Sequence, residues 1–211
     1  MTITDEAIAR ALEHLRASDP VLADVIARVG PFRMKRRANR FQALVRAIIF
    51  QQISGSAGQS ILRRLSQLLE PGGMTAVNLI RFSPAQLRTA GVSPQKACYL
   101  LDLSRKVVAG EVRLSRLGRM NNDEVIAELT RIKGIGVWTA QMFLMFSLRR
   151  IDVFPHGDLG IRSALRNLYG LKDLPDEKRS HKIAATWRPY ATIASWYCWR
   201  SLEFGKPSRV S

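Results

Sequence analysis

The sequence has few cysteines, no long apolar run and far fewer acidic than basic residues. Its two cysteines, Cys98 and Cys198, are too few for a four-cysteine zinc or iron–sulfur site. We expect two buried free thiols, although the sequence leaves a disulfide between them open. No apolar run reaches the ~20 residues of a membrane span. Residues 1–30 show no basic stretch followed by an apolar core, so we expect no secretion, no membrane association and an intracellular protein.

Basic residues outnumber acidic ones by 33 to 17, which gives a formal net charge of +16. Such a surface favours a polyanionic partner, most often nucleic acid. A generally solubilising surface or an arginine-rich genome is the alternative. Five basic residues gather in the connector 32–40, which is either a DNA-facing patch or a solvated linker: Arg33, Lys35, Arg36, Arg37 and Arg40.

Almost no segment alternates with period two, whereas apolar residues recur at helical spacing throughout. The sequence therefore predicts an all-α fold without a sheet. The expected helices cover about 5–30 with a break at Asp19-Pro20, then 41–52, 57–69, 76–81, 84–90, 97–109, 122–132, 138–148, 161–169, 176–187 and 190–199.

The residues around 122–148 predict two helices joined by a glycine hairpin. Asn121 and Glu124 have the spacing of a helix N-terminal capping box. Gly134 and Gly136 then interrupt the helical pattern. The N–H groups at the start of the second helix lack intrahelical partners, so they can bind a phosphate together with Lys133 and the Thr139 hydroxyl. A tight turn between two helices explains the same glycines without any ligand.

A loop rich in proline and glycine follows over residues 151–160. Asp158 at its end is a plausible N-cap for the next helix. Together, the pattern L-x-x-I-x-G-I-G-x-W-T-A over 129–140 and D-V-F-P-x-x-D-x-G over 152–160 closely resembles the signature of the helix-hairpin-helix DNA glycosylase superfamily. A weaker likeness extends over 40–54 and 187–200. Within the superfamily the chain is most similar to the DNA-3-methyladenine glycosylase II group.

The resemblance implies one glycosylase domain over 1–211, made of two helical lobes with the active-site cleft between them. Lobe 1 is expected at about 1–40 plus 165–211, and lobe 2 at about 41–164, containing the hairpin 122–148. It also implies double-stranded DNA with a damaged base as partner, and a monomeric protein.

Asp158 matches the catalytic aspartate of that superfamily. Cleavage of a base–sugar bond builds positive charge on the sugar, which a carboxylate stabilises while it orients or deprotonates the attacking water. Asp152 is better explained as a structural cap or surface charge. His156 is either a proton relay or, as we rather expect, a loop residue that contacts backbone or solvent.

The pocket and wedge residues are also implied by the resemblance. Trp138 and Trp199 match positions that hold the base, while Met142 and Leu159 make this pocket less aromatic than in some relatives. Gln52 matches the residue that fills the gap left by a flipped base. The two other tryptophans, Trp187 and Trp196, are expected in the core.

The reaction type follows from residues that are missing. A cationic purine such as 3-methyladenine leaves without protonation, and the motif region offers no second carboxyl group as a general acid. Trp138 stands where bifunctional relatives carry a Schiff-base lysine, so we expect no lyase activity. No cofactor and no iron–sulfur cluster are expected. The resemblance does imply a Na⁺ or K⁺ ion held by the backbone carbonyls of Thr130, Ile132 and Ile135.

Three alternatives remain open from the sequence. The same scaffold could act on a mismatched, deaminated or oxidised base. A non-catalytic helix-hairpin-helix module would bind DNA without using Asp158. An RNA-binding protein would account for the charge, although no RNA-binding motif is recognisable.

Overall fold

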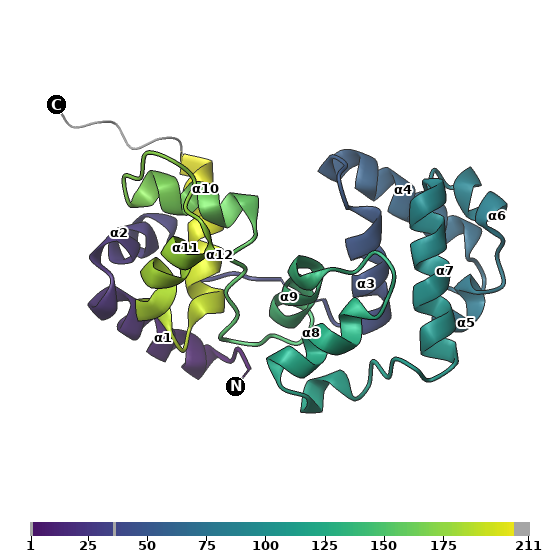
Figure 1. Ribbon diagram of the computed structural model, residues 1–211, viewed down its shortest axis with the longest axis horizontal. Helices are drawn as coiled ribbons and strands as arrows, with labels where there is room; N and C mark the ends of the chain where they lie inside the picture. The colour runs from purple at the N-terminus through teal and green to yellow at the C-terminus, as the bar shows by residue number, and fades with distance from the viewer. Residues whose placement is uncertain (1, 36, 205–211) are drawn as a thin grey trace. The chain divides into compact units, whose positions relative to one another are not determined.

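The computed structural model describes residues 2–35 and 37–204. The prediction of an all-α fold is confirmed, because the described residues form helices and only one isolated bridge, between Thr2 and Arg150. The α-helices are α1 (Asp5–Ser18), α2 (Pro20–Val29), α3 (Arg40–Ile49), α4 (Gly55–Leu68), α5 (Ala76–Leu79), α6 (Pro84–Thr89), α7 (Pro94–Val108), α8 (Asn122–Thr130), α9 (Val137–Phe146), α10 (Leu159–Leu168), α11 (Glu177–Ala184) and α12 (Ala191–Ser201) (Figure 1). Short 3₁₀ turns are η1 (Leu117–Arg119), η2 (Ala185–Trp187) and η3 (Leu202–Phe204).

The chain divides into two compact units, and α9 runs from one into the other. Unit 1 comprises Met1–Arg36 and Leu144–Ser211, and unit 2 comprises Arg37–Phe143. Residues 144–164, which the sequence analysis assigned to lobe 2, therefore belong to unit 1. The reason is packing, since Ile151, Phe154 and Ile161 are buried in the core of unit 1.

Unit 1 is built around α12, which packs against α1, α2 and α10 (Figure 1). Its largest fully buried side chains are Trp187 and Tyr197, so the expected core role of Trp187 is confirmed. Trp196 is half-buried and packs edge-to-face against Phe32, with 4.8 Å between the ring centroids.

Asp19 is a buried carboxylate that links three elements of unit 1. Its Oδ1 accepts from the backbone N–H of Leu22 at 3.1 Å and so caps α2. Its Oδ2 accepts from Trp187 Nε1 at 2.8 Å and from the Tyr169 hydroxyl. Burial is the main cause that raises the pKa of Tyr169 far above its usual value, and the hydrogen bond to Asp19 is the next. The hydroxyl therefore stays protonated and donates a hydrogen bond to Asp19.

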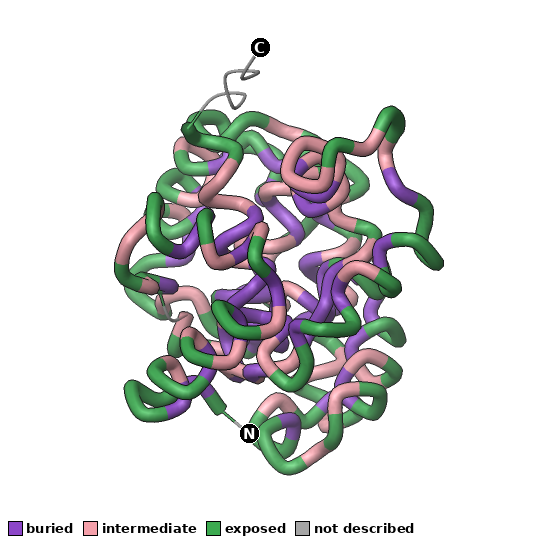
Figure 2. The backbone as a smooth tube through the Cα atoms, turned by 90° about the vertical axis from the view of Figure 1, so that its left-hand side faces the viewer, coloured by how far each residue is buried: buried purple, intermediate pink, exposed green. Residues whose placement is uncertain are grey.

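In unit 2, α7 packs against α3, α5 and α6, and α3 packs against α4. Most helices of both units carry buried residues on one face and exposed residues on the other, which is the pattern of amphipathic helices, whereas α12 has no exposed residue (Figure 2). Helix α7 begins at Pro94, three residues before the predicted start, because Ser93 caps it and proline suits the first helical position.

The two cysteines and the basic connector differ in part from what the sequence predicted. Both cysteines are free, but only Cys198 is buried and Cys98 is exposed. Arg40 donates to the carbonyls of Leu114 and Ser115 at 2.5 and 3.0 Å, so this member of the basic connector has a structural role. Arg36 lies outside the described residues.

Among the described helices, none combines the length and the apolar character required to span a membrane.

Candidate active site

Asp158 lies at the start of α10, at the end of the loop 151–157. Its Oδ1 accepts from the backbone N–H of Ile161 at 2.9 Å, so the predicted N-cap is confirmed. Its own N–H donates to the carbonyl of Pro155 at 2.9 Å, which closes a tight turn. The half-buried carboxylate is thus fixed at the partly positive end of a helix.

Trp199 holds the same oxygen from the other side. Its indole Nε1 donates to Asp158 Oδ1 at 2.8 Å, although the two residues are 41 positions apart in the sequence. The indole also stacks on Phe146, with 6.0 Å between centroids and 24° between planes. The carboxylate therefore has a defined orientation, set by a helix end and a packed ring.

Gly160 makes room for this pair. A Cβ on Gly160 would lie 3.0 Å from Asp158 Oδ1 and 3.0 Å from Trp199 Cδ1. Such distances are shorter than nearly all Cβ contacts, so any side chain here would press on the pair of Asp158 and Trp199. The sequence showed this glycine only as the last letter of a motif.

The loop ahead of Asp158 is fastened to the start of α12. The Thr192 hydroxyl donates to the carbonyl of Arg150 at 2.8 Å and accepts from the N–H of Val153 at 3.0 Å. Asp152 Oδ1 accepts from the N–H of Ala191 at 3.3 Å, where the N-cap residue Tyr190 offers no side-chain bond. The structural explanation of Asp152 is therefore confirmed.

The hairpin in unit 2 uses its first glycine for its own packing. Gly134 has φ of +80°, and a Cβ there would lie 2.1 Å from the ring of Tyr99. The backbone N–H of Lys133 donates to Asp102 Oδ2 at 2.8 Å, which holds the turn against α7. Only glycine combines the positive φ at position 134 with the close approach of the Tyr99 ring.

Gly136 differs from Gly134, because its φ is ordinary and no atom lies within 4 Å of the place that a Cβ would take. It is exposed and directly precedes α9, whose first N–H groups have no intrahelical partner. Lys133 is also exposed. Thr139 is only 4% exposed, so it is better explained as a core residue of α9 than as the predicted phosphate contact.

The loop with Gln52 is tied to the hairpin. Gln52 is exposed and has φ of +54°. The side-chain Nε2 of its neighbour Gln51 donates to the carbonyl of Gly134 at 2.7 Å. Lys96 Nζ donates to the carbonyls of Ile49 and Gln51 at 2.7 and 2.8 Å, while partial burial lowers the pKa of this amine.

The segment that contains Asp158, the hairpin and Gln52 matches a known protein family. The family model described as "HhH-GPD superfamily base excision DNA repair protein" matches residues 45–189, which is more than half of the chain and contains Asp158, the hairpin and Gln52. The chain belongs to the HhH-GPD superfamily.

Similar members of the superfamily are known in both sequence and structure. The DNA-3-methyladenine glycosylase 1 of Schizosaccharomyces pombe is 31% identical over 210 residues, which cover 96% of this chain and 92% of that protein. The structure of the 3-methyladenine DNA glycosylase of the same yeast, in complex with abasic DNA, superposes with a TM-score of 0.86 at 30% identity, covering 95% of this chain and 100% of that one. A DNA-3-methyladenine glycosidase from Bacillus halodurans gives a TM-score of 0.80 at 36% identity, covering 90% and 88% of the two chains.

The predicted pocket residues of this HhH-GPD chain lie in different units. In unit 1, Trp199 contacts Asp158. Leu159, which directly follows Asp158 in the sequence, is 64% exposed. In unit 2, Trp138 is 43% exposed at the start of α9 and Met142 is half-buried on the same helix.

Proposed function

We propose that this protein is a DNA glycosylase that flips alkylated, positively charged purines such as 3-methyladenine out of duplex DNA and hydrolyses their N-glycosidic bond. The observation that carries the proposal is the Asp158 carboxylate, held by Trp199 and by the start of α10 at a position that matches the family's catalytic aspartate. The names of the similar proteins in yeast and Bacillus support the class of base.

Asp158 acts on the sugar in this proposal. As the base departs, positive charge grows on the deoxyribose, and an oriented carboxylate stabilises it without a large rearrangement. The same carboxylate orients or deprotonates the attacking water. Because Oδ1 is fixed by two donors, the oxygen does not have to be reoriented during the reaction.

A cationic base is recognised by aromatic faces and leaves without a general acid. Trp199 and the exposed Leu159 provide a ring and an apolar surface directly beside Asp158. Trp138 and Met142 stay predicted pocket residues on α9. We also propose that the enzyme lacks lyase activity, since Trp138 has no amine that could attack the sugar.

We propose that the hairpin binds the DNA backbone through the N–H groups at Gly136 and the start of α9, with Lys133 adding charge. Gln52 is proposed to fill the gap left by the flipped base. A monovalent cation bound by the carbonyls of Thr130, Ile132 and Ile135 stays a prediction. The Ile132 carbonyl accepts one hydrogen bond, from Ile135 N–H at 3.1 Å, and has a second lone pair for an ion. We expect a monomer that works wherever the cell keeps its DNA.

The test is release of free base from methylated duplex DNA by the wild-type protein, Asp158→Asn and Asp158→Ala. We expect the wild type to release 3-methyladenine and leave an intact, alkali-labile strand, and both variants to be inactive. Asparagine can still cap α10, so Asp158→Asn should keep its stability, whereas Asp158→Ala should lose about 0.5–2 kcal/mol.

Three results would overturn parts of the proposal. Activity only on mismatched, deaminated or oxidised bases would contradict the substrate class. Binding to abasic DNA without release of any base would indicate a non-catalytic module. Strand cleavage without alkali would contradict the absence of a lyase.

A further inference from the structure

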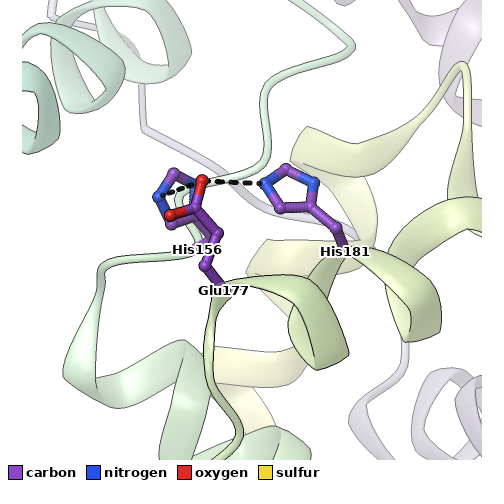
Figure 3. Close-up of side chains that lie close together, drawn as sticks. All are labelled: His156, Glu177 and His181. Carbon is purple, nitrogen blue, oxygen red and sulfur yellow. Dashed lines mark ion pairs between the residues drawn. The ribbon is translucent and has the colours of Figure 1, made fainter.

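A second cluster of chemically active side chains lies in unit 1, beside the loop that carries Asp158. His156 comes from that loop, and Glu177 and His181 come from α11 (Figure 3). Glu177 Oε1 lies 3.4 Å from His156 Nε2 and 3.9 Å from His181 Nε2. The sequence predicted that His156 contacts backbone or solvent, but its ring lies against Glu177 and His181.

The three donor atoms converge on one region. One ligand atom from each residue can be chosen so that all of them lie within 4.8 Å of one another. Glu177 and His181 are four residues apart on a helix, so they share one face and act as a pair. In Figure 3, dashed lines join one carboxylate oxygen of Glu177 to a nitrogen of each imidazole ring.

We propose that His156, Glu177 and His181 bind a divalent transition-metal ion of the Zn²⁺ class, in a site with three protein ligands and one open position. Two imidazoles and one carboxylate form a donor set that zinc uses in proteins. At bond lengths of ~2.0–2.1 Å, tetrahedral ligands stand about 3.4 Å apart. The distance between His156 and Glu177 already has this value. The distance between Glu177 and His181 has to shorten by about 0.5 Å, and that between the two imidazoles by up to about 1.4 Å.

The surroundings leave the glutamate more room to adjust than the two imidazoles, which have to turn toward one another to close the site. The His181 ring packs edge-to-face on the buried Phe154, with 5.2 Å between centroids, and this contact limits how far it turns. The Glu177 side chain is 69% exposed, so few neighbouring atoms restrict its approach to an ion. His156 is 28% exposed and is held by a turn in which its N–H donates to the carbonyl of Phe154 at 3.0 Å.

A metal ion at this place would connect the loop 155–157 to α11. His156 is two residues before Asp158, so the ion would restrain the backbone that leads into the carboxylate. The ion is inferred as a restraint on this loop and not as a reactant, and its binding does not depend on the proposed glycosylase function. Three basic residues on the same helix lower the affinity by repulsion: Lys178, Arg179 and Lys182.

The experiment uses the full chain without a histidine tag and Zn²⁺ alone as the probe. Titration against a chromogenic zinc indicator should give one ion per chain. Co²⁺ should show the visible absorption of a four-coordinate site. His156→Ala and His181→Ala should each weaken binding by about tenfold or more, since even changes behind the ligands cost about 10–100-fold. Saturating Zn²⁺ should raise the melting temperature of the wild type.

Two other side chains provide matched controls. The chain has three histidines, and the remaining one, His14, contacts the carbonyl of Thr186 at 2.9 Å. Cys98 is an exposed thiol that could capture zinc by itself. His14→Ala and Cys98→Ser should both keep the ion.

Absence of stoichiometric binding by the folded wild type would overturn the proposal. So would binding that survives in His181→Ala, or that disappears in Cys98→Ser. Circular dichroism of each variant separates loss of a ligand from loss of folding. Glu177→Gln provides the second check. It replaces one oxygen of an exposed side chain and should weaken the binding of Zn²⁺ without altering the fold.

Discussion

Trp199 donates its indole N–H to Oδ1 of Asp158 at 2.8 Å, and the same oxygen accepts from the start of α10. The tryptophan predicted from the resemblance as a base-stacking residue is therefore also a partner of the predicted catalytic carboxylate. One side chain thus links the orientation of the carboxylate with the surface offered to the base.

Trp199→Phe should separate these two roles. The phenyl ring can still stack on Phe146, but the donor to Asp158 is lost. A hydrogen bond to a charged group contributes about 1.5–3 kcal/mol, which corresponds to about a tenfold to hundredfold loss in the single-turnover rate. The matched control is Trp196→Phe on the same helix, whose ring packs against Phe32. Equal loss in both variants would mean that the effect is one of helix packing.

Gly160→Ala should impair the reaction more than the fold. Its methyl group would press on both Asp158 Oδ1 and Trp199 Cδ1, each 3.0 Å away, so these atoms would have to yield by a few tenths of an ångström. A misplacement of about 1 Å can cost about a hundredfold in rate, so we expect this smaller shift to cost about tenfold or less. Gly157→Ala is the control, because it lies in the same loop with no atom within 4 Å of the new methyl. Full activity of Gly160→Ala in single-turnover base release would show that the pair tolerates displacement.

Features set by neighbouring residues were predictable from the sequence. The capping box of Asn121 and Glu124 and the cap by Asp158 depend on atoms three residues apart, and both are present. The start of α7 was predicted three residues late, at 97, whereas Pro94 is the first helical residue after the cap Ser93.

Pairings between distant residues left no signal in the sequence. The hydrogen bond between Trp199 and Asp158 joins residues 41 positions apart, and that between Gln51 and Gly134 joins residues 83 positions apart. The convergence of His156 with Glu177 and His181 also depends on how the loop packs against α11. Thr139 is buried because it lies on the inward face of α9. The sequence does not reveal that face, because α9 is apolar over nearly its whole length.

The two hairpin glycines should respond differently to alanine. Gly134→Ala introduces a positive-φ strain of roughly 1–2 kcal/mol and a clash with Tyr99, so it should lower the free energy of unfolding. Gly136→Ala has open space around it and should leave stability within about 0.5 kcal/mol. If this backbone approaches a phosphate, the methyl group should weaken binding to abasic duplex DNA across sequences. Unchanged binding by a stable Gly136→Ala would show that the hairpin is only a turn between helices.

Lys96→Met should loosen the loop that presents Gln52. The ammonium group bonds the carbonyls of Ile49 and Gln51, and methionine keeps most of the side-chain volume without either bond. Because Gln52 is held at φ of +54°, a conformation that glutamine seldom adopts, the loop depends on such external contacts. We expect slower base flipping, measured with a fluorescent base analogue, while binding to unmodified duplex changes little. The control is Lys106→Met on the same helix, which removes a cation 3.9 Å from Glu111. A normal flipping rate in Lys96→Met would mean that Gln52 is held by the link from Gln51 to Gly134, and the double variant with Gln51→Ala would then have to be slow.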